Sequence, residues 1–384
     1  MGKRQSTVID LSGVPFIVAS YYGVDLHKDQ ITWHRIDWLS DGTIHRANGK
    51  TAAGRIFEDF TPHLDTERDY LIVEASGSTF FFYTLVAEHC KQAIIVNPAA
   101  FRELYMSGKK TDRVDAKKLA DRLMYHIEMN DADDGFPQVF IPDETAIQVR
   151  ELVTTYELIV KQTTQIKNQL KAIFRAKLIP VIADVLEEGL EHALDHPRID
   201  AADRRIAQSL KALYDTLCAE KQSMKEAILD IGITRFRGEV ELLTSINGIG
   251  IFGAIVFMAD VVTVDRFKSA KKLTSYLASV GKVDSSGTVI RDGGLNKRGR
   301  RTSYRHILQG LEHVVNGNDN FRRFRDKHRS KRANKVRAAI VRKTFVAMYY
   351  MLKINERYRF VNETVHRRKS QELNRIITKS RIAA

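Results

Sequence analysis

The spacing of apolar and polar residues changes along this chain and divides it into consecutive parts. After a leader at residues 1–20, residues 21–143 hold short apolar runs rich in β-branched side chains, which is typical of buried strands. Strands are predicted at Tyr21–Asp37, near residues 43–47, at Tyr70–Val73 and at residues 92–100. Helices are predicted at residues 51–69, from Thr79, and across Asp112. Strands alternating with helices indicate an α/β domain.

From residue 144 the apolar positions follow helical spacing instead. Two long runs, broken near Pro180 and at the turn His196-Pro197, predict a pair of antiparallel, coiled-coil-like helices over residues 144–236. Such a hairpin serves as an oligomerisation arm or a spacer. Residues 237–360 are predicted to form a mainly α domain, and residues 361–384 a basic tail that frays at its end.

The turn at residues 246–250, Ile-Asn-Gly-Ile-Gly, joins two apolar helices of that C-terminal domain. A helix–hairpin–helix of this type offers backbone N–H groups to a DNA phosphate. An ordinary glycine turn between helices accounts for the segment equally well. Both interpretations stay open at this stage.

Four carboxylates stand where a divalent-metal site needs them. Asp25 is on the first predicted strand, Glu74 ends another, and Asp112 and Asp115 share one face of a helix that Thr111 or Asp112 can cap. Mg²⁺ takes oxygen ligands, and two such ions can clamp the attacking and leaving oxygens of a phosphodiester. Each acid alone has a structural explanation: Asp25 as a turn residue, Glu74 as a charge at a helix N-terminus, and Asp112 with Asp115 as part of a solvated helix with ion pairs. Four acids in this order would repel one another, which favours a site with bound cations.

Charge distribution points to a polyanionic partner. The 384 residues carry a net charge of +14, and the stretch from Arg291 to Lys343 holds nearly all of it, with 17 basic and 4 acidic residues. Aromatic and aliphatic residues such as Tyr304, Phe321 and Ile340 recur there at helical spacing, so the stretch is folded surface rather than a solvated tail. Phosphate binding that depends on salt is the expected consequence.

The hydrophobic segments and the cysteines indicate where in the cell the protein is expected. No apolar run reaches the roughly 18 residues of a membrane span, and no hydrophobic signal-peptide core follows the N-terminus. The 2 cysteines, Cys90 and Cys218, fit a reducing cytoplasm and support neither disulfides nor a zinc site. A cytoplasmic protein is expected.

A second centre of chemistry is a glycine- and serine-rich loop that contains Ser285 and Ser286. Basic residues surround it, namely Arg291, Lys297, Arg298, Arg300 and Arg301. A serine among arginines can accept a phosphoryl group, because guanidinium groups hold phosphate bidentately and stabilise the alkoxide. The composition alone fits a loop that only binds backbone phosphate.

With these residues in view, the chain resembles the IS-one-ten class of insertion-sequence transposases, the DEDD/serine recombinases guided by a bridge RNA. The resemblance rests on GVD, VEASGS and KTDRVDA in the first half and on INGIG, SSG and GGLNKRG in the second. It implies an RNase-H-like, RuvC-like domain whose acidic tetrad falls on Asp25, Glu74, Asp112 and Asp115. The family's nucleophile precedes a glycine, which maps to Ser286, with Ser285 one residue away; Asn247 stands where the family usually has proline.

The resemblance further implies site-specific DNA recombination through a 5′-phosphoserine, assisted by Mg²⁺. A structured RNA would pair with donor and target DNA, and a homo-oligomer, from dimer to tetramer, would bring acids and serine from different subunits together. One alternative is a metal-dependent nuclease of Holliday-junction type, in which water is the nucleophile and Ser286 only binds phosphate. Another is a nucleic-acid-binding scaffold whose carboxylates are structural.

Overall fold

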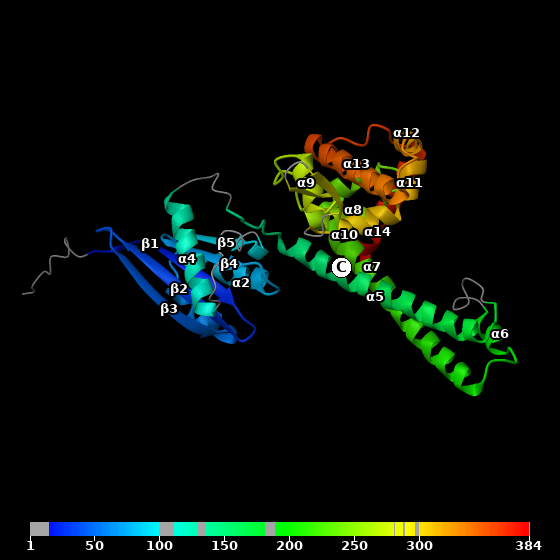
Figure 1. Cartoon of the computed structure of the whole chain (residues 1–384), viewed down its shortest axis with the longest axis horizontal. Helices are drawn as coiled ribbons and strands as arrows, with labels where there is room; N and C mark the ends of the chain where they lie inside the picture. Colours follow the sequence, from blue (N-terminus) through cyan, green and yellow to red (C-terminus); the bar gives the residue numbers. More distant parts are fainter. Residues whose placement is uncertain are drawn as a thin grey trace, which may run out of the picture. The chain divides into compact units, whose positions relative to one another are not determined.

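The computed structural model describes residues 15–99, 111–129, 136–180, 189–279, 281–286, 289–295 and 299–383, without the side chains of residues 281–295 and 379–383. The chain forms two compact units, Met1–Ile141 and Pro142–Ala384. In Figure 1 the first unit is coloured blue to cyan and the second green to red. The expected helical pair and C-terminal domain thus belong to one compact unit.

The first unit is built on a five-stranded mixed sheet with the order β3-β2-β1-β4-β5. The strands are β1 (Ile17–Leu26), β2 (Gln30–Leu39), β3 (Ile44–Ala52), β4 (Asp69–Glu74) and β5 (Gln92–Val96). β1 pairs antiparallel with β2, and β2 with β3, whereas β4 runs parallel to both β1 and β5. The strands predicted at Tyr70–Val73 and in residues 92–100 are confirmed.

Helices cover both faces of this sheet, as Figure 1 shows for α2 (Thr79–Val86) and α4 (Asp112–Glu128). Successive residues of a strand point to opposite faces, so the strands supply two separate cores. Tyr22, Val24 and Val73 pack with Phe82 of α2. Tyr21 and Ile72 pack instead with the side chains that α4 contributes, Leu119, Ala120 and Leu123.

Two local predictions for this unit are wrong. The run Tyr21–Asp37 is not one strand, because the polar residues after Leu26 form a turn in which the amide of His27 donates to the Gln30 carbonyl over 3.0 Å. The expected helix at residues 51–69 is replaced by the end of β3 and the short helices Ala53–Arg55, α1 (Ile56–Asp59) and Thr61–His63. Pro62 has no N–H and Gly54 has a low helix propensity, which explains the interruption.

The second unit begins with two long helices, α5 (Glu144–Ala176) and α7 (Ala201–Thr244), with short α6 (Leu190–Leu194) between them. Figure 1 shows α5 and α7 side by side, and Leu170 and Phe174 of α5 share a buried cluster with Ala207 and Tyr214 of α7. α7 is kinked at Phe236, where the backbone leaves helical geometry. The two predicted long helices are therefore confirmed, and coiled-coil geometry stays a prediction.

The rest of the second unit is mostly helical and packs around the apolar helix α8. Its helices are α8 (Ile251–Val261), α9 (Ala270–Tyr276), α10 (Thr302–Gln309), α11 (Leu311–Asn316), α12 (Asp319–Lys327), α13 (Ala333–Ile354) and α14 (Glu363–Ala383). A hairpin of β6 (Gly281–Ser286) and β7 (Val289–Leu295) follows α9. No helix in the described part of the chain is long and apolar enough to cross a membrane.

Most of the basic tail predicted at residues 361–384 forms a helix instead of an extension. It forms α14, with Leu373 buried in the core of the second unit. Lys369 of this helix donates from Nζ to three backbone carbonyls, those of Thr244, Ile246 and Ile249, over 2.8–3.0 Å. Burial lowers the pKa of Lys369 to about 8. The tail thus caps the end of α7 and the turn that follows.

Candidate metal centre and serine hairpin

Asp25 and Glu74 lie at the carboxyl ends of two neighbouring parallel strands. Val24 of β1 is in register with Val73 of β4, so the next residue of each strand is one of these acids. Alternation along β1 places Asp25 on the same face as Tyr21, and alternation along β4 places Glu74 on the same face as Ile72. That face is the one which α4 covers.

The first turn of α4 carries the other two acids. Thr111 caps the helix: its side chain accepts a hydrogen bond from the amide of Val114, as predicted. Asp112 and Asp115 follow directly within that turn. Carboxylates are stabilised there by the unsatisfied N–H groups of a helix start, so the sequence favours this helix boundary.

The path of α4 across the sheet brings its first turn to the end of β1. The helix packs on β1 at Gly23, where its backbone at Ala116 and Ala120 approaches the strand. Further along the helix, the hydroxyl of Tyr21 donates a hydrogen bond to Glu128. The strand and the helix therefore run in opposite directions, and Asp25, which follows Gly23 on β1, lies towards Asp112 at the start of α4.

His27 joins the acids, and sequence reasoning did not identify it. Its Nε2 lies 3.2 Å from Oδ2 of Asp25 and 3.2 Å from Oδ2 of Asp112. Ligand atoms of these three residues all lie within 4.8 Å of one another. The one available signal was position: His27 is two residues after Asp25 and so continues the same side of an extended chain.

The electrostatics of the cluster fit a bound cation. Burial raises the pKa of Asp25, His27 lowers it, and the negative charges of Asp112 and Asp115 raise it further. The side chain of Asp25 is 25% exposed, so the acids crowd at an accessible edge of the sheet. Two carboxylates and an imidazole within reach of one point, with Asp115 close enough to act on Asp25, form a donor set suited to a divalent metal.

The serines occupy a β-hairpin, not the flexible loop that was expected. Both Ser285 and Ser286 belong to β6, and Ser286 pairs with Val289 of β7 at the end of the hairpin. Strand pairing therefore holds the backbone of the serine segment. The side chains of both serines lie outside the described residues.

The predicted phosphate-binding cations have different environments. Arg291 is in β7, with its side chain outside the described residues, and Lys297 and Arg298 lie outside them entirely. Arg301 is the residue before α10 and is half-buried. Arg300 donates from Nε to Oδ1 of Asp260 over 2.8 Å, so its guanidinium is already engaged by a carboxylate.

Asp260 ties the segment after the hairpin to α8, although its sequence context of FMADV gave no sign of this. It is 2% exposed, and its Oδ2 accepts from the amide of Ser303 over 3.0 Å and from the Ser303 hydroxyl over 2.6 Å. Its carbonyl accepts from Arg150 over 3.0 Å and from the hydroxyl of Tyr276 over 3.1 Å. A single buried acid thus holds Arg300, the start of α10 and two neighbouring helices together.

The glycine turn between α7 and α8 is packed within its own unit. Gly248 has a φ of +89°, and a Cβ there would lie 2.4 Å from the amide nitrogen of Val314 in α11. Lys369 binds carbonyls on both sides of this glycine. These contacts give the turn a structural role as a helix connection, and phosphate binding by it stays a prediction.

Comparison with known proteins connects the two regions that carry these residues. A family model described as a DEDD transposase matches residues 22–177, which include all four acids. A model described as the transposase IS116/IS110/IS902 family matches residues 240–328, which include the serine hairpin and Asp260. The chain is also similar to the transposase for insertion sequence element IS1111A of Coxiella burnetii, being 21% identical over 262 residues that span 65% of this chain and 68% of that protein.

The matches occur in the order in which the motifs occur, acids first and serine hairpin second. The mixed α/β sheet of the first unit is consistent with an RNase-H-like DEDD domain, and mostly helical regions follow it. A DEDD transposase family also implies dependence on a divalent metal, which the cluster at Asp25 fits. The chain belongs to the IS110 class of insertion-sequence transposases, and it is an enzyme that acts on DNA.

Proposed function

We propose that this transposase is a site-specific DNA recombinase that cuts and rejoins strands through Ser286 and is directed by a structured RNA. The observation that carries the proposal is the grouping of Asp25 and Asp112 around one point, with Asp115 close enough to raise the pKa of Asp25. An acidic cluster of this kind at the end of a sheet, in a chain with a basic second unit, supports phosphoryl transfer on a nucleic acid.

In this proposal Asp25, Glu74, Asp112 and Asp115 hold Mg²⁺. When bound, the ion would neutralise charge that develops on the scissile phosphate and polarise its oxygens. The four acids orient the ion, and their mutual repulsion keeps the site selective for a cation. The hairpin contributes a different part of the chemistry, the nucleophile.

The covalent step exchanges one phosphate ester for another. The hydroxyl oxygen of Ser286 forms a bond to phosphorus and releases its proton to solvent, while the bond to the 3′ oxygen breaks and that oxygen leaves as a hydroxyl after protonation. The product is a 5′-phosphoserine. Attack by the 3′-hydroxyl of another strand reverses the step and frees Ser286, so the strands are rejoined without ATP.

Recognition of donor and target DNA is assigned to base pairing with the RNA. The cation-rich stretch from Arg291 to Lys343 supports binding of both nucleic acids through their backbones. The long α5–α7 pair offers a surface through which copies of the chain assemble, from dimer to tetramer. Activity on the nucleoid in the cytoplasm follows from a DNA substrate.

A denaturing gel tests the nucleophile directly. Full-length protein is mixed with its candidate RNA, Mg²⁺ and labelled DNA that carries the element junction, and wild type is compared with Ser286→Ala and Glu74→Ala. A protein–DNA adduct that both substitutions abolish is the expected result. Ser285→Ala is the matched control, since it removes the same hydroxyl one residue away, and it should retain the adduct.

Other outcomes identify the alternatives. Nicked DNA that persists with Ser286→Ala means that water is the nucleophile, as in a metal-dependent nuclease of Holliday-junction type. Loss of the adduct with Ser285→Ala but not Ser286→Ala moves the nucleophile by one residue. An adduct that forms equally well without RNA would overturn RNA guidance while leaving serine chemistry in place.

A further inference from the structure

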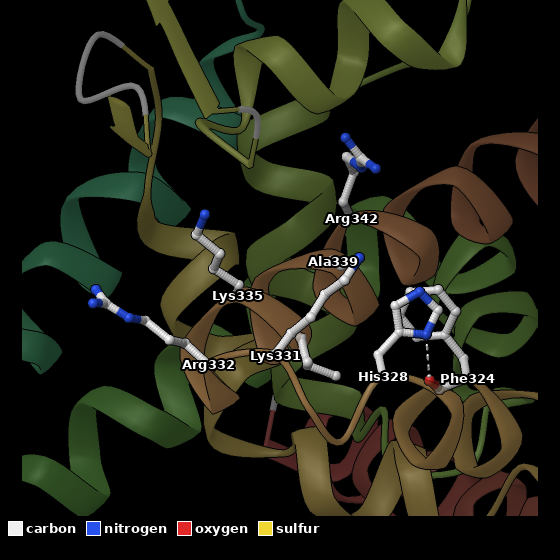
Figure 2. A pocket seen from close by; sticks show the side chains of 8 residues that line it. Phe324, His328, Lys331, Arg332, Lys335, Ala339 and Arg342 are labelled. Carbon is white, nitrogen blue, oxygen red and sulfur yellow. Dashed lines mark hydrogen bonds between the residues drawn. The ribbon is translucent and has the colours of Figure 1, made fainter. Parts of the chain in front are cut away.

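A basic pocket lies between α12 and α13, within the cation-rich stretch from Arg291 to Lys343. Its volume is about 890 Å³, and it is lined by Phe324, His328, Lys331, Arg332, Lys335, Val336, Ala339 and Arg342. Figure 2 shows Phe324 and His328 at one side of the pocket and Arg332 and Lys335 at the other, with Lys331 between them. Four of the eight lining residues carry a permanent positive charge, and none carries a negative one.

Three of the lining cations, Lys331, Arg332 and Arg342, differ from nearby arginines in having no acidic partner. Arg325 and Arg329 pair with Asp326, and Arg337 lies 3.6 Å from Glu312. Within the described part of the chain, no ion pair joins any of the three lining cations to a carboxylate. Their charges are exposed and uncompensated.

One wall of the pocket is aromatic. Phe324 and His328 stack with ring centroids 4.4 Å apart and an angle of 22° between the planes. A ring nitrogen of His328, Nδ1, lies 3.1 Å from the carbonyl oxygen of Phe324, which fixes the imidazole. Lys343 covers the Phe324 ring, with its nitrogen 4.8 Å from the centroid. Cations beside a fixed aromatic surface are the combination that nucleic-acid strands bind, phosphates on the cations and bases or sugars on the rings.

The charges at the start of α13 do not stabilise this helix. The residue before the helix is Arg332, Lys335 is in its first turn, and that turn holds no acid. Positive charges at the positive end of a helix dipole are unfavourable. A bound anion would turn the unfavourable charges of Arg332 and Lys335 into favourable ones, which gives these residues a functional reason.

We propose that the α12–α13 pocket binds the phosphodiester backbone of a nucleic-acid strand, through Lys331, Arg332 and Arg342, with the Phe324–His328 stack beside it. This inference rests on the proposed function, because it assumes a nucleic-acid substrate or guide. It adds a binding surface separate from the predicted cations at residues 291–301. The same backbone chemistry occurs in DNA and in RNA, and the test below separates them.

Fluorescence anisotropy with the full-length protein measures binding to two labelled probes, a DNA duplex of about 30 base pairs and an RNA stem-loop, across a salt series. The test variant combines Lys331→Ala, Arg332→Ala and Arg342→Ala. The matched control combines Arg322→Ala, Arg329→Ala and Arg337→Ala, which removes the same charge from exposed residues that already have acidic partners. Far-UV circular dichroism verifies that both variants are folded.

The test variant should bind at least one probe about tenfold more weakly at physiological salt, and the slope of log K against log salt should fall by about 2 to 3. The control should change both quantities far less. Loss confined to the duplex assigns the pocket to DNA, and loss confined to the stem-loop assigns it to RNA.

Equal losses in the test and control variants would mean that only overall charge matters, and would overturn the pocket while leaving the proposed function intact. A wild-type protein that binds neither probe would overturn the proposed function and the pocket together.

Discussion

Gly23 of β1 and Ala116 of α4 are in such close approach that a Cβ on Gly23 would lie 2.1 Å from the carbonyl oxygen of Ala116. The amide nitrogen of Ala120 would be 2.4 Å away. No side chain can be accommodated between the strand and the helix at this point without moving one of them. The separation between Asp25 on the strand and Asp112 on the helix therefore depends on a glycine two residues before Asp25.

Replacing Gly23 with alanine should displace α4 and disturb the metal cluster. We expect Gly23→Ala to lower the free energy of unfolding of the first unit by about 1–3 kcal/mol, the usual cost of overpacking, and to weaken divalent-metal binding. Urea unfolding followed by tryptophan fluorescence reports this unit, since the 2 tryptophans, Trp33 and Trp38, are both in β2. Gly54→Ala is the control, because nothing lies within 4 Å of a Cβ there; equal effects would contradict the role of Gly23.

The imidazole of His27 should influence which metal the cluster prefers. Mg²⁺ strongly prefers oxygen ligands, whereas Mn²⁺ accepts imidazole nitrogen more readily. We therefore expect His27→Ala to weaken Mn²⁺ binding by about threefold or more while changing Mg²⁺ binding less. Electron paramagnetic resonance of free Mn²⁺, with Mg²⁺ as competitor, measures both affinities.

A matched control for His27 is His45→Ala, which changes an exposed histidine on β3. An equal loss of affinity for both metals in His27→Ala would show that His27 acts only by orienting Asp25 and Asp112. No loss for either metal would remove His27 from the site.

Asp260 should be essential for the ordered connection between the hairpin and α10. Asp260→Ala leaves the guanidinium of Arg300 and the amide of buried Ser303 without their acceptor, and a buried donor left without a partner costs about 1–3 kcal/mol. Thermal unfolding monitored by the helical circular dichroism signal, together with adduct yield on the denaturing gel, measures the effect. Asp265→Ala removes a surface acid that pairs with Lys353 and should change neither; similar behaviour of the two variants would refute the anchoring role.

Asp69 should make the stability of the first unit depend on pH. Burial raises the pKa of this carboxyl, which is 2% exposed, to about 6, above the value of about 3.9 in an unfolded chain. Between these two pKa values the folded state therefore binds more protons than the unfolded state. The stability that protonated Asp69 contributes is lost as the pH rises through about 6. Asp69→Asn cannot ionise, so its stability relative to wild type should increase from pH 4.5 to pH 7.5 by about 1–3 kcal/mol.

Urea unfolding followed by tryptophan fluorescence at several pH values measures this difference. Asp59→Asn, an exposed acid of α1 paired with Arg55, is the control and should show little pH-dependent difference from wild type. A constant difference between Asp69→Asn and wild type across this range would show that Asp69 is ionised throughout.

Much of the fold could be predicted from local patterns. The apolar run before Glu74, the cap at Thr111 and the long helical repeats of α5 and α7 are all signals that reside within a few turns or residues of sequence. The turn at His27–Asp29 and the interruption at Pro62 were harder, because a strand continues or ends according to what pairs with it. The last antiparallel pair, Leu26 with Ile31, shows where β1 ends and β2 begins.

The candidate site divides in the same way. Its acids could be named from their order and spacing, because carboxylates at strand ends and on a helix face of a basic chain are typical of a metal site for phosphate chemistry. The involvement of His27, the engagement of Arg300 by Asp260 and the basic pocket between α12 and α13 could not be named. Each depends on side chains brought together by packing between elements.

By itself, therefore, the sequence determined the class of elements, the positions of the four acids and the serines, and the concentration of positive charge in the second half. Tertiary structure alone decided that α4 crosses β1 at Gly23, so that Asp112 meets Asp25 and His27, and that α14 is a packed helix instead of a tail. The physical reason is the distance along the chain over which each kind of interaction acts. Propensity, capping and periodicity act between neighbours in the chain, whereas the distance between two carboxylates depends on the close packing of backbone against backbone.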